Sequence, residues 1–146
     1  MRTKNSDQYL TNRAWLSDAT KHERVVLRGV SALEYLQLFS GYCGESEIEV
    51  YALKKGVYEN VKYRVVNAFD GLDFFQHNGV LCSTAEQAIN DLLADNTSDE
   101  QALAESLSQY YYGNKGSFAG LTIRKENRKE FERMKEWAIE RYNERT

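Results

Sequence analysis

The sequence predicts an α+β fold, in which a small, mostly antiparallel sheet is covered by helices and three helices form the C-terminal end. Three observations predict it. Apolar and polar residues alternate in the middle of the chain, the dipeptides Asp70-Gly71 and Asn78-Gly79 favour hairpin turns, and the period becomes helical after Ser83. The 146 residues contain no proline and no repeat. We therefore expect one domain over 1–146, divided into an N-terminal helix (1–24), a core (25–93) and C-terminal helices (98–146).

Helical spacing and a possible helix cap predict the elements of the first 41 residues. A short amphipathic helix is expected over Ser6–Thr20, where apolar residues recur at roughly helical intervals. The apolar run Val25–Leu27 fits either a strand or a short extended approach to the next helix. Ser31 and Glu34 have the spacing of a capping box, so a helix is predicted to begin at Ser31 and to end at Gly41.

An antiparallel meander is predicted next. Residues with two distinct faces alternate over Ile48–Ala52 and again over Tyr63–Phe69. A third short strand is expected over Leu72–His77, because Asp70-Gly71 and Asn78-Gly79 are the dipeptides that best tolerate the positive backbone angles of two-residue hairpin turns.

Three helices are predicted after the sheet. Those over Ser83–Leu93 and Ser98–Tyr112 each open with a serine three residues before Glu86 or Gln101, the capping-box spacing, and Gly113 closes the second. The third runs over Glu126–Asn143. Its expected buried stripe consists of Phe131, Met134, Ala138 and Tyr142, with Trp137 beside it.

Composition limits the class of protein. Hydrophobic residues make up 42% and charged residues 28%, which is the balance of a globular domain. No apolar run approaches the roughly 18 residues that a membrane span needs, and the first residues are too polar for a signal peptide. Cys43 and Cys82 lack the CxxC spacing of zinc or redox sites. We expect reduced thiols, a cytoplasmic location and no membrane contact.

Charge is unevenly distributed along the chain. The formal net charge is -3, which gives no general attraction for nucleic acid. No Lys or Arg occurs between Val65 and Asn114, whereas this stretch contains eight acidic residues. Such a stretch is usually a solvated face, but it also fits a surface complementary to a basic partner. The predicted partner-binding residues are Asp91, Asp95, Asp99, Glu100 and Glu105.

No catalytic, cofactor-binding or metal-binding set is predicted. His22 and His77 lie far apart and neither belongs to a ligand pair. Cys82 with His77 is the minimal nucleophile and base pair, but their odd separation places strand residues on opposite faces, which favours a packed thiol and a solvated histidine. An unrecognised small enzyme that uses Cys82, or the carboxylates Asp70 and Asp73, remains an alternative.

A second alternative is a regulatory protein that binds nucleic acid. Tyr110-Tyr111-Tyr112 beside Lys115 could stack on bases, although helix burial of the tyrosines is the simpler interpretation. The alternative would gain support if the flanks formed one exposed basic face, made of Arg24, Arg28, Arg128 and Arg133.

Two segments resemble the carboxy-terminal domain of AbiEi-type antitoxins, which belong to abortive-infection toxin-antitoxin systems. The first, Leu27–Leu38, reads LRGVSALEYLQL and is similar to the family's helix start. The second, Gly79–Leu93, reads GVLCSTAEQAINDLL and is similar to the family's strand, Ser/Thr helix cap and Asp-Leu-Leu ending. The resemblance covers about Val25 to Leu93. Family members usually add a winged helix that binds the operator, and the residues before Leu27 offer only one expected helix, so the resemblance does not extend to operator binding.

The resemblance implies a cytosolic antitoxin that counteracts a nucleotidyltransferase-like toxin in phage defence. It transfers no catalytic residue to this sequence. The expected function is therefore a non-catalytic interaction protein whose partner is such a toxin, with nucleic acid an unlikely ligand.

Overall fold

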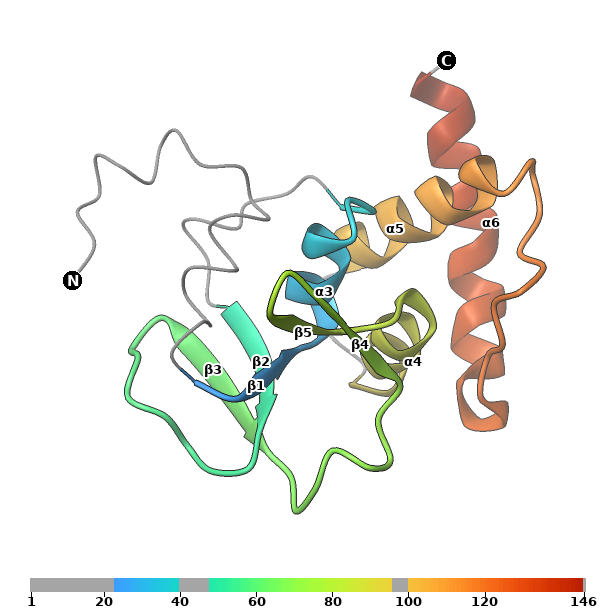
Figure 1. The fold of residues 1–146 in the computed structure, drawn as a ribbon. Helices are drawn as coiled ribbons and strands as arrows, with labels where there is room; N and C mark the ends of the chain where they lie inside the picture. The colour runs from blue at the N-terminus through green and yellow to red at the C-terminus, as the bar shows by residue number, and fades with distance from the viewer. Residues whose placement is uncertain (1–22, 40–47, 96–99, 146) are drawn as a thin grey trace, which may run out of the picture.

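The computed structural model describes residues 23–39, 48–95 and 100–145, and the fold is α+β (Figure 1). The strands are β1 (Val25–Leu27), β2 (Ile48–Ala52), β3 (Val61–Val65), β4 (Phe74–His77) and β5 (Val80–Ser83). The helices are α3 (Gly29–Tyr35), α4 (Ala85–Asp95), α5 (Glu100–Gly113) and α6 (Arg128–Arg145), the last preceded by a 3-10 turn, η1 (Lys125–Asn127). The helix expected over 6–20 and the cap expected at Ser98 lie outside the described residues.

The five strands form one mixed sheet in the order β3-β2-β1-β5-β4. β1 pairs antiparallel with β2 and parallel with β5, β2 pairs parallel with β3, and β4 pairs antiparallel with β5. The expected antiparallel meander fits only in part: β2 and β3 are neighbours but run parallel, and the consecutive strands β3 and β4 occupy opposite edges. The short apolar run Val25–Leu27, which fitted two interpretations, is the fully buried central strand.

The Asp70-Gly71 dipeptide does not join neighbouring strands. Residues 66–73 instead carry the chain from the β3 edge to the β4 edge, and the turn there is made by the Leu72 N–H, which bonds the Phe69 carbonyl at 3.0 Å. This crossing segment packs Phe69 against Val26 and Tyr51, on one face of the sheet. We call this face the back face.

The hairpin expected at Asn78-Gly79 is confirmed. It joins β4 and β5 with His77 opposite Val80, and both turn residues have positive φ, 50° at Asn78 and 82° at Gly79. Positive φ at both central positions is the requirement of a type I′ turn, which is why this dipeptide was informative.

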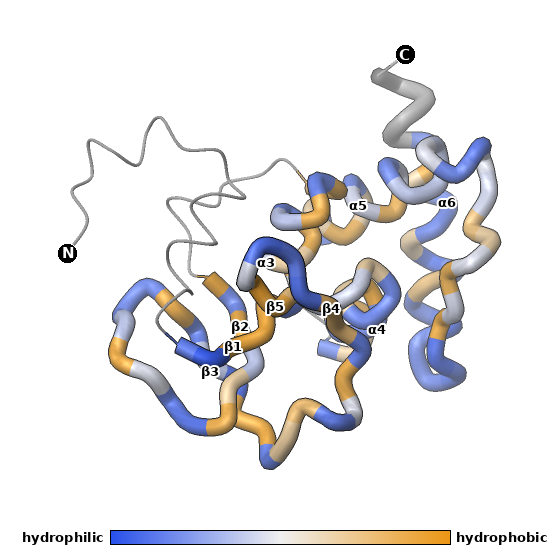
Figure 2. The backbone as a smooth tube through the Cα atoms, in the orientation of Figure 1, coloured by the Kyte–Doolittle hydropathy of each residue, from blue (hydrophilic) through white to orange (hydrophobic). Residues whose placement is uncertain are grey.

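The helices cover the other face, the front face, and one apolar core joins them to the sheet. Figure 2 shows hydrophobic segments gathering where α3 and α4 meet the strands, and more hydrophilic colour along α6. The fully buried members of this core come from strands and from all four helices: Leu27, Leu33, Ile48, Val50, Cys82, Ile89, Leu92, Leu107 and Met134. Residues 25–93 and the C-terminal helices therefore share one core. No helix in the described part of the chain is long and apolar enough to span a membrane.

α3 begins and ends where the sequence did not indicate. It starts at Gly29, and Ser31 does not cap it: the Ser31 hydroxyl accepts the N–H of Glu49 at 2.8 Å and joins α3 to β2. At the other end Gln37 adopts φ 64°, while the Leu38 N–H bonds the Leu33 carbonyl at 2.9 Å. This is a Schellman motif without glycine, so the helix stops well before Gly41.

The cap of α4 is shifted by one residue from the expected one. Ser83 is the last residue of β5, and Thr84 Oγ1 accepts the Gln87 N–H at 3.2 Å. Glu86 does not reach back to the cap, because its carboxylate accepts the N–H of Thr122 at 2.6 Å. On α6, Phe131, Met134 and Ala138 are buried as predicted, and Trp137 is 39% exposed.

Candidate functional site

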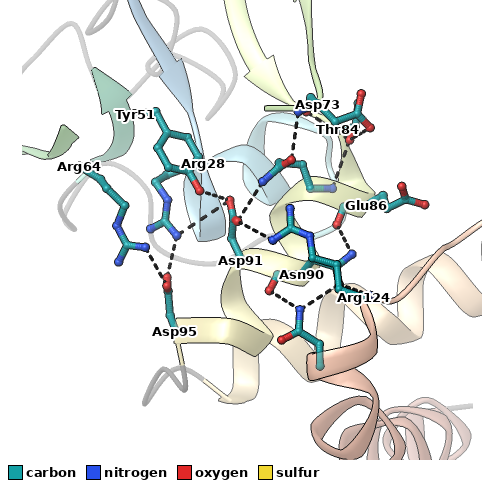
Figure 3. Close-up of polar contacts among 12 residues, drawn as sticks. Arg28, Tyr51, Arg64, Asp73, Thr84, Glu86, Asn90, Asp91, Asp95 and Arg124 are labelled. Atoms are coloured by element: carbon teal, nitrogen blue, oxygen red, sulfur yellow. Dashed lines mark hydrogen bonds and ion pairs between the residues drawn. The ribbon is translucent and has the colours of Figure 1, made fainter. Parts of the chain in front are cut away.

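A buried arginine, Arg28, lies at the centre of a cluster of polar side chains (Figure 3). Arg28 follows β1 directly, its side chain is 3% exposed, and its guanidinium lies 4.9 Å from the centroid of the Tyr51 ring. It donates to Glu49 Oε1 at 3.2 Å and to Asp95 Oδ2 at 2.7 Å. A guanidinium so deeply buried requires carboxylate partners, and two elements distant in sequence provide them.

Asp95 connects this arginine to a second one. Its Oδ1 accepts from Arg64 at 2.8 Å, so the two carboxylate oxygens each bind a guanidinium, one buried and one about half exposed. Burial alone would raise the pKa of Asp95, but the hydrogen bonds from Arg28 and Arg64 outweigh it and the pKa is lowered. Burial likewise opposes the charge on Arg28, and the bonds to Asp95 and Tyr51 raise its pKa nevertheless.

Asp91 lies one helical turn before Asp95 and is 6% exposed. It accepts the Tyr51 hydroxyl at 2.6 Å and the Gln87 side-chain amide at 3.0 Å, and it lies 3.9 Å from the Arg28 guanidinium. The pKa of Tyr51 is raised, first by burial and then by its bond to Asp91. We call Arg28, Glu49, Tyr51, Arg64, Asp91 and Asp95 the Arg28 cluster.

Glu49 contributes to the cluster from β2. Its carboxylate binds Arg28 and accepts the backbone N–H of Val30, at the start of α3. Burial raises the pKa of Glu49, and the charge of Arg28 offsets part of that rise. Gly29 has φ 53°, and a Cβ placed there would lie 3.3 Å from Glu49 Oε1. A glycine is needed because the chain turns in the left-handed region directly beside this carboxylate.

A second set of amides joins α4 to the segment before α6. Asn90 donates to the Glu86 and Thr122 carbonyls, each at 2.9 Å, and its Oδ1 accepts from Arg124 N and from Asn127 Nδ2. Asn90 and Asn127 are both almost completely buried. Together with the Arg28 cluster, these bonds make α4 the element that connects the sheet to the C-terminal helices.

The back face has a charged opening beside β3. A pocket of about 390 Å³ is lined by Arg28, Glu49, Lys62, Tyr63, Arg64 and Asp95. Glu49 and Lys62 are register partners on β2 and β3, as are Tyr51 and Arg64. The two carboxylates are already engaged by Arg28, so the free charge at this opening is that of the exposed Lys62 and of the outer part of Arg64.

The structure separates the predicted partner-binding residues. Asp91 and Glu105 are buried, and Asp95 is 18% exposed and ion-paired. Glu100 is 43% exposed and pairs with Arg133, and Asp99 lies outside the described residues. The acidic stretch is therefore not one continuous acidic face, since part of it supplies the internal partners of Arg28.

The thiol and the imidazole of the enzymatic alternative both face the helices, contrary to the alternation argument. The type I′ hairpin places His77 opposite Val80 and Phe75 opposite Cys82, so both side chains point to the front face. Cys82 is fully buried, and its Sγ lies 3.3 Å from the Ser83 carbonyl. His77 Nδ1 lies 2.9 Å from the Tyr35 hydroxyl, so the imidazole is bonded rather than simply solvated.

The carboxylates of the enzymatic alternative, a metal site and the basic face were the other candidates. Asp70 is exposed, and Asp73 Oδ2 accepts from the Thr84 hydroxyl at 2.9 Å. In the described part of the chain, no group of three or more His, Cys, Asp or Glu side chains could hold a metal ion. The basic face required for nucleic-acid binding does not form as proposed, because Arg28 is internal and Arg133 pairs with Glu100 and Glu130.

Comparison with known proteins finds no match among models of protein families, curated proteins or solved structures.

Sequence reasoning did not identify Arg28, Glu49, Tyr51 or Arg64 as members of one cluster. One signal was available: Arg28 interrupts an otherwise apolar stretch, Val25 to Val30, and an arginine there must either reach solvent or find carboxylates. Its partners lie 21 and 67 residues away in the chain, which no local pattern indicates.

Proposed function

We propose that the chain is a non-catalytic, antitoxin-like interaction protein that binds and counteracts a nucleotidyltransferase-type toxin in the cytosol, as part of phage defence. The family resemblance of Leu27–Leu38 and Gly79–Leu93 suggests the partner class. The observation that carries the proposal concerns the reactive side chains described above. The Cys82 thiol is buried, and Glu49, Asp91 and Asp95 are bonded to other side chains of the fold.

Three features support binding over catalysis. The thiol of Cys82 has no solvent exposure, so it is a poor nucleophile for an outside substrate. Asp91 is held between Tyr51 and Gln87, which leaves it no free oxygen directed at a pocket. The pocket beside β3 contains the carboxylates of Glu49 and Asp95, and each of them accepts a hydrogen bond from Arg28. A general acid or base needs a proton that it can exchange with substrate, and these groups are committed elsewhere.

The proposal is tested by co-expression. The gene adjacent to that of this chain is expressed in bacteria from an inducible promoter, alone and together with the full chain, and surviving colonies are counted. We expect the neighbour to be a nucleotidyltransferase-like protein that stops growth alone and allows growth when the chain is present. A neighbour of another class, or toxicity that persists with the chain expressed, would refute the proposal.

A purified mixture separates binding from indirect rescue. The two proteins should co-elute from a size-exclusion column as one complex, and the toxin's nucleotide transfer should fall in proportion to the chain added. If the chain rescues growth but neither binds the toxin nor lowers its activity in vitro, neutralisation does not act through contact, and the interaction role is wrong.

A further inference from the structure

The outer edge of β3 is an unpaired strand edge in the described part of the chain. β3 is the last strand in the sheet order, and the only described strand that it pairs with is β2. The Ile48 N–H bonds the Asn60 carbonyl and the Val66 N–H bonds the Ala52 carbonyl, each at 2.8 Å. Because a parallel ladder uses alternate residues, the backbone groups of Tyr63 and Val65 point away from β2. They are therefore available to another strand.

The two faces of this edge differ chemically. On the back face, Lys62 is exposed and Arg64 is 51% exposed, at positions two residues apart that share one side of a strand. On the other side, Val65 is 56% exposed, and Leu53 and Val57, in the connection between β2 and β3, are 48% and 84% exposed. Among the described residues the remaining large hydrophobic side chain that is exposed is Trp137 on α6, far from β3 (Figure 1). Three of these four exposed hydrophobic side chains thus belong to β3 or to the connection that leads into it.

We propose that the outer edge of β3 binds an extended segment of a partner protein in which acidic residues alternate with apolar residues. The segment would add a strand to the sheet through the backbone groups of Tyr63 and Val65. Alternate side chains of an added strand point to opposite faces, so its acidic residues would lie beside Lys62 and Arg64 while its apolar residues lie beside Val65. The identity of that partner as the toxin rests on the proposed function; the edge and its specificity do not.

Charge selects this occupant over a second copy of the chain. Two β3 strands paired edge to edge would bring Lys62 and Arg64 of each copy close to the same cations of the other, and like charges on neighbouring strands are destabilising. Exposed lysines nearby, Lys54 and Lys55, add to the positive field. A partner segment with carboxylates on one side would instead place negative charges beside these cations, and opposite charges on neighbouring strands are stabilising.

The edge is tested with a synthetic peptide of alternating Glu and Val, fluorescently labelled and titrated with the full chain. We expect saturable binding that weakens with added salt. A peptide of alternating Lys and Val should not bind. The Glu–Val peptide methylated on alternate backbone nitrogens should bind about tenfold more weakly or worse, because it cannot donate to the strand edge. Equal binding of the methylated peptide, or no binding of the unmodified one, would overturn the proposal.

Two variants locate the binding. Val65→Pro removes the outward N–H, and proline is tolerated on an edge strand where the N–H faces away from its own sheet. Val65→Thr keeps that N–H and a β-branched side chain, and is its control. We expect peptide binding to survive Val65→Thr and to be lost in Val65→Pro. Lys62→Gln should weaken binding, whereas Lys125→Gln, an exposed lysine in η1, should not. Unchanged binding by Val65→Pro would refute the proposal that the peptide binds at the outer edge of β3.

The same variants separate this inference from the proposed function. In the co-expression assay, rescue by the unmodified chain and by Val65→Thr but not by Val65→Pro supports both. Rescue by Val65→Pro supports the antitoxin role and shows that the β3 edge is not required for neutralisation. Failure of the unmodified chain refutes the antitoxin role, and the peptide titration then decides the edge by itself. Circular dichroism on each variant checks that the chain is folded.

Discussion

The Tyr51 hydroxyl donates a 2.6 Å hydrogen bond to Asp91, a residue 40 positions further along the chain. The bond joins the back face of the sheet to α4, and the Arg28 guanidinium lies over the same ring. Three residues from three elements thus constrain one another. Because these contacts are buried, we expect substitutions that remove them to change the free energy of unfolding measurably.

Loss of the central arginine should be costly. Arg28→Ala removes the buried cation that Glu49, Asp91 and Asp95 share, and removing one partner of a buried ion pair costs about 3–5 kcal/mol. Urea unfolding followed by circular dichroism measures the change. Arg64→Ala is the control, since its exposed pair with Asp95 should contribute less than about 1 kcal/mol. Similar losses from both variants would show that burial does not set the strength of the cluster.

Tyr51 and Asp91 should be energetically coupled. Tyr51→Phe removes the hydroxyl and leaves one oxygen of Asp91 short of a donor, at a cost of about 1–3 kcal/mol. Asp91→Asn keeps the shape of the side chain and weakens the same bond. The double variant should then lose less free energy of unfolding than the sum of the single variants. Strict additivity would mean that the bond contributes nothing.

Asp95 and Glu49 should change acid stability in opposite directions. The folded-state pKa of Asp95 lies below its ordinary 3.8, so its contribution to stability is present above that value and is lost as the pH falls through the folded-state pKa. The folded-state pKa of Glu49 lies above its ordinary 4.5, so its contribution is complete below that value and is lost as the pH rises through the folded-state pKa.

The measurement is urea unfolding at a series of acidic pH values. Asp95→Asn should make the loss of stability on acidification shallower, and Glu49→Gln should make it steeper, because it removes the group that opposes the loss. Identical pH slopes for the two variants and the unmodified chain would contradict both assignments.

Gly29 should not tolerate a side chain. Gly29→Ala forces an L-residue into the left-handed region, at a cost of about 1–2 kcal/mol, and its Cβ would press on Glu49 Oε1. Gly71→Ala is a matched control, because a Cβ at Gly71 meets nothing within 4 Å. Thermal unfolding should show a clear loss for the first and almost none for the second. A neutral Gly29→Ala would mean that the start of α3 can rearrange.

Asn127 should hold the start of α6 on α4. Asn127→Ala removes both of its bonds to Asn90 and should cost about 1–3 kcal/mol. Because the bonds are local, amide hydrogen exchange should accelerate first in η1 and the start of α6, while the strands keep their protection. Exchange that accelerates equally in β1 would show that this contact is not separable from the rest of the core.

The sequence allowed the elements to be predicted better than their arrangement. The type I′ dipeptide Asn78-Gly79 identified a hairpin because its backbone angles are a local property. Asp70-Gly71 has the same chemistry, but the chain there continues across the back face. The decisive interaction is burial of Phe69 against Val26 and Tyr51, a long-range contact.

The difference between local and long-range interactions also explains the site. The sequence shows that the acidic residues cluster, but whether each is a surface charge or an internal partner depends on Arg28, which is distant in sequence. Asp91 and Asp95 lie on a helix that packs against α3, and both carboxylates point toward Arg28, which directly precedes α3. The expected cap of α4 is wrong by one residue, because Thr84 and not Ser83 caps the helix. The expected cap of α3 is wrong by three, because Arg28 and not Ser31 precedes the helix.

The order of the strands affects how the nascent chain matures. The central strand β1 is among the first described residues to be synthesised, but its neighbour β5 and the carboxylates of Asp91 and Asp95 emerge more than 50 residues later. Until then Arg28 lacks two of its anions and one side of β1 is open. Because long-range contacts are slow to form, we expect the β1–β5 ladder and the ion pairs of Arg28 with α4 to form late. We expect a chain interrupted before α4, which lacks Asp91 and Asp95, to be less stable and more readily cleaved by proteases than the full chain.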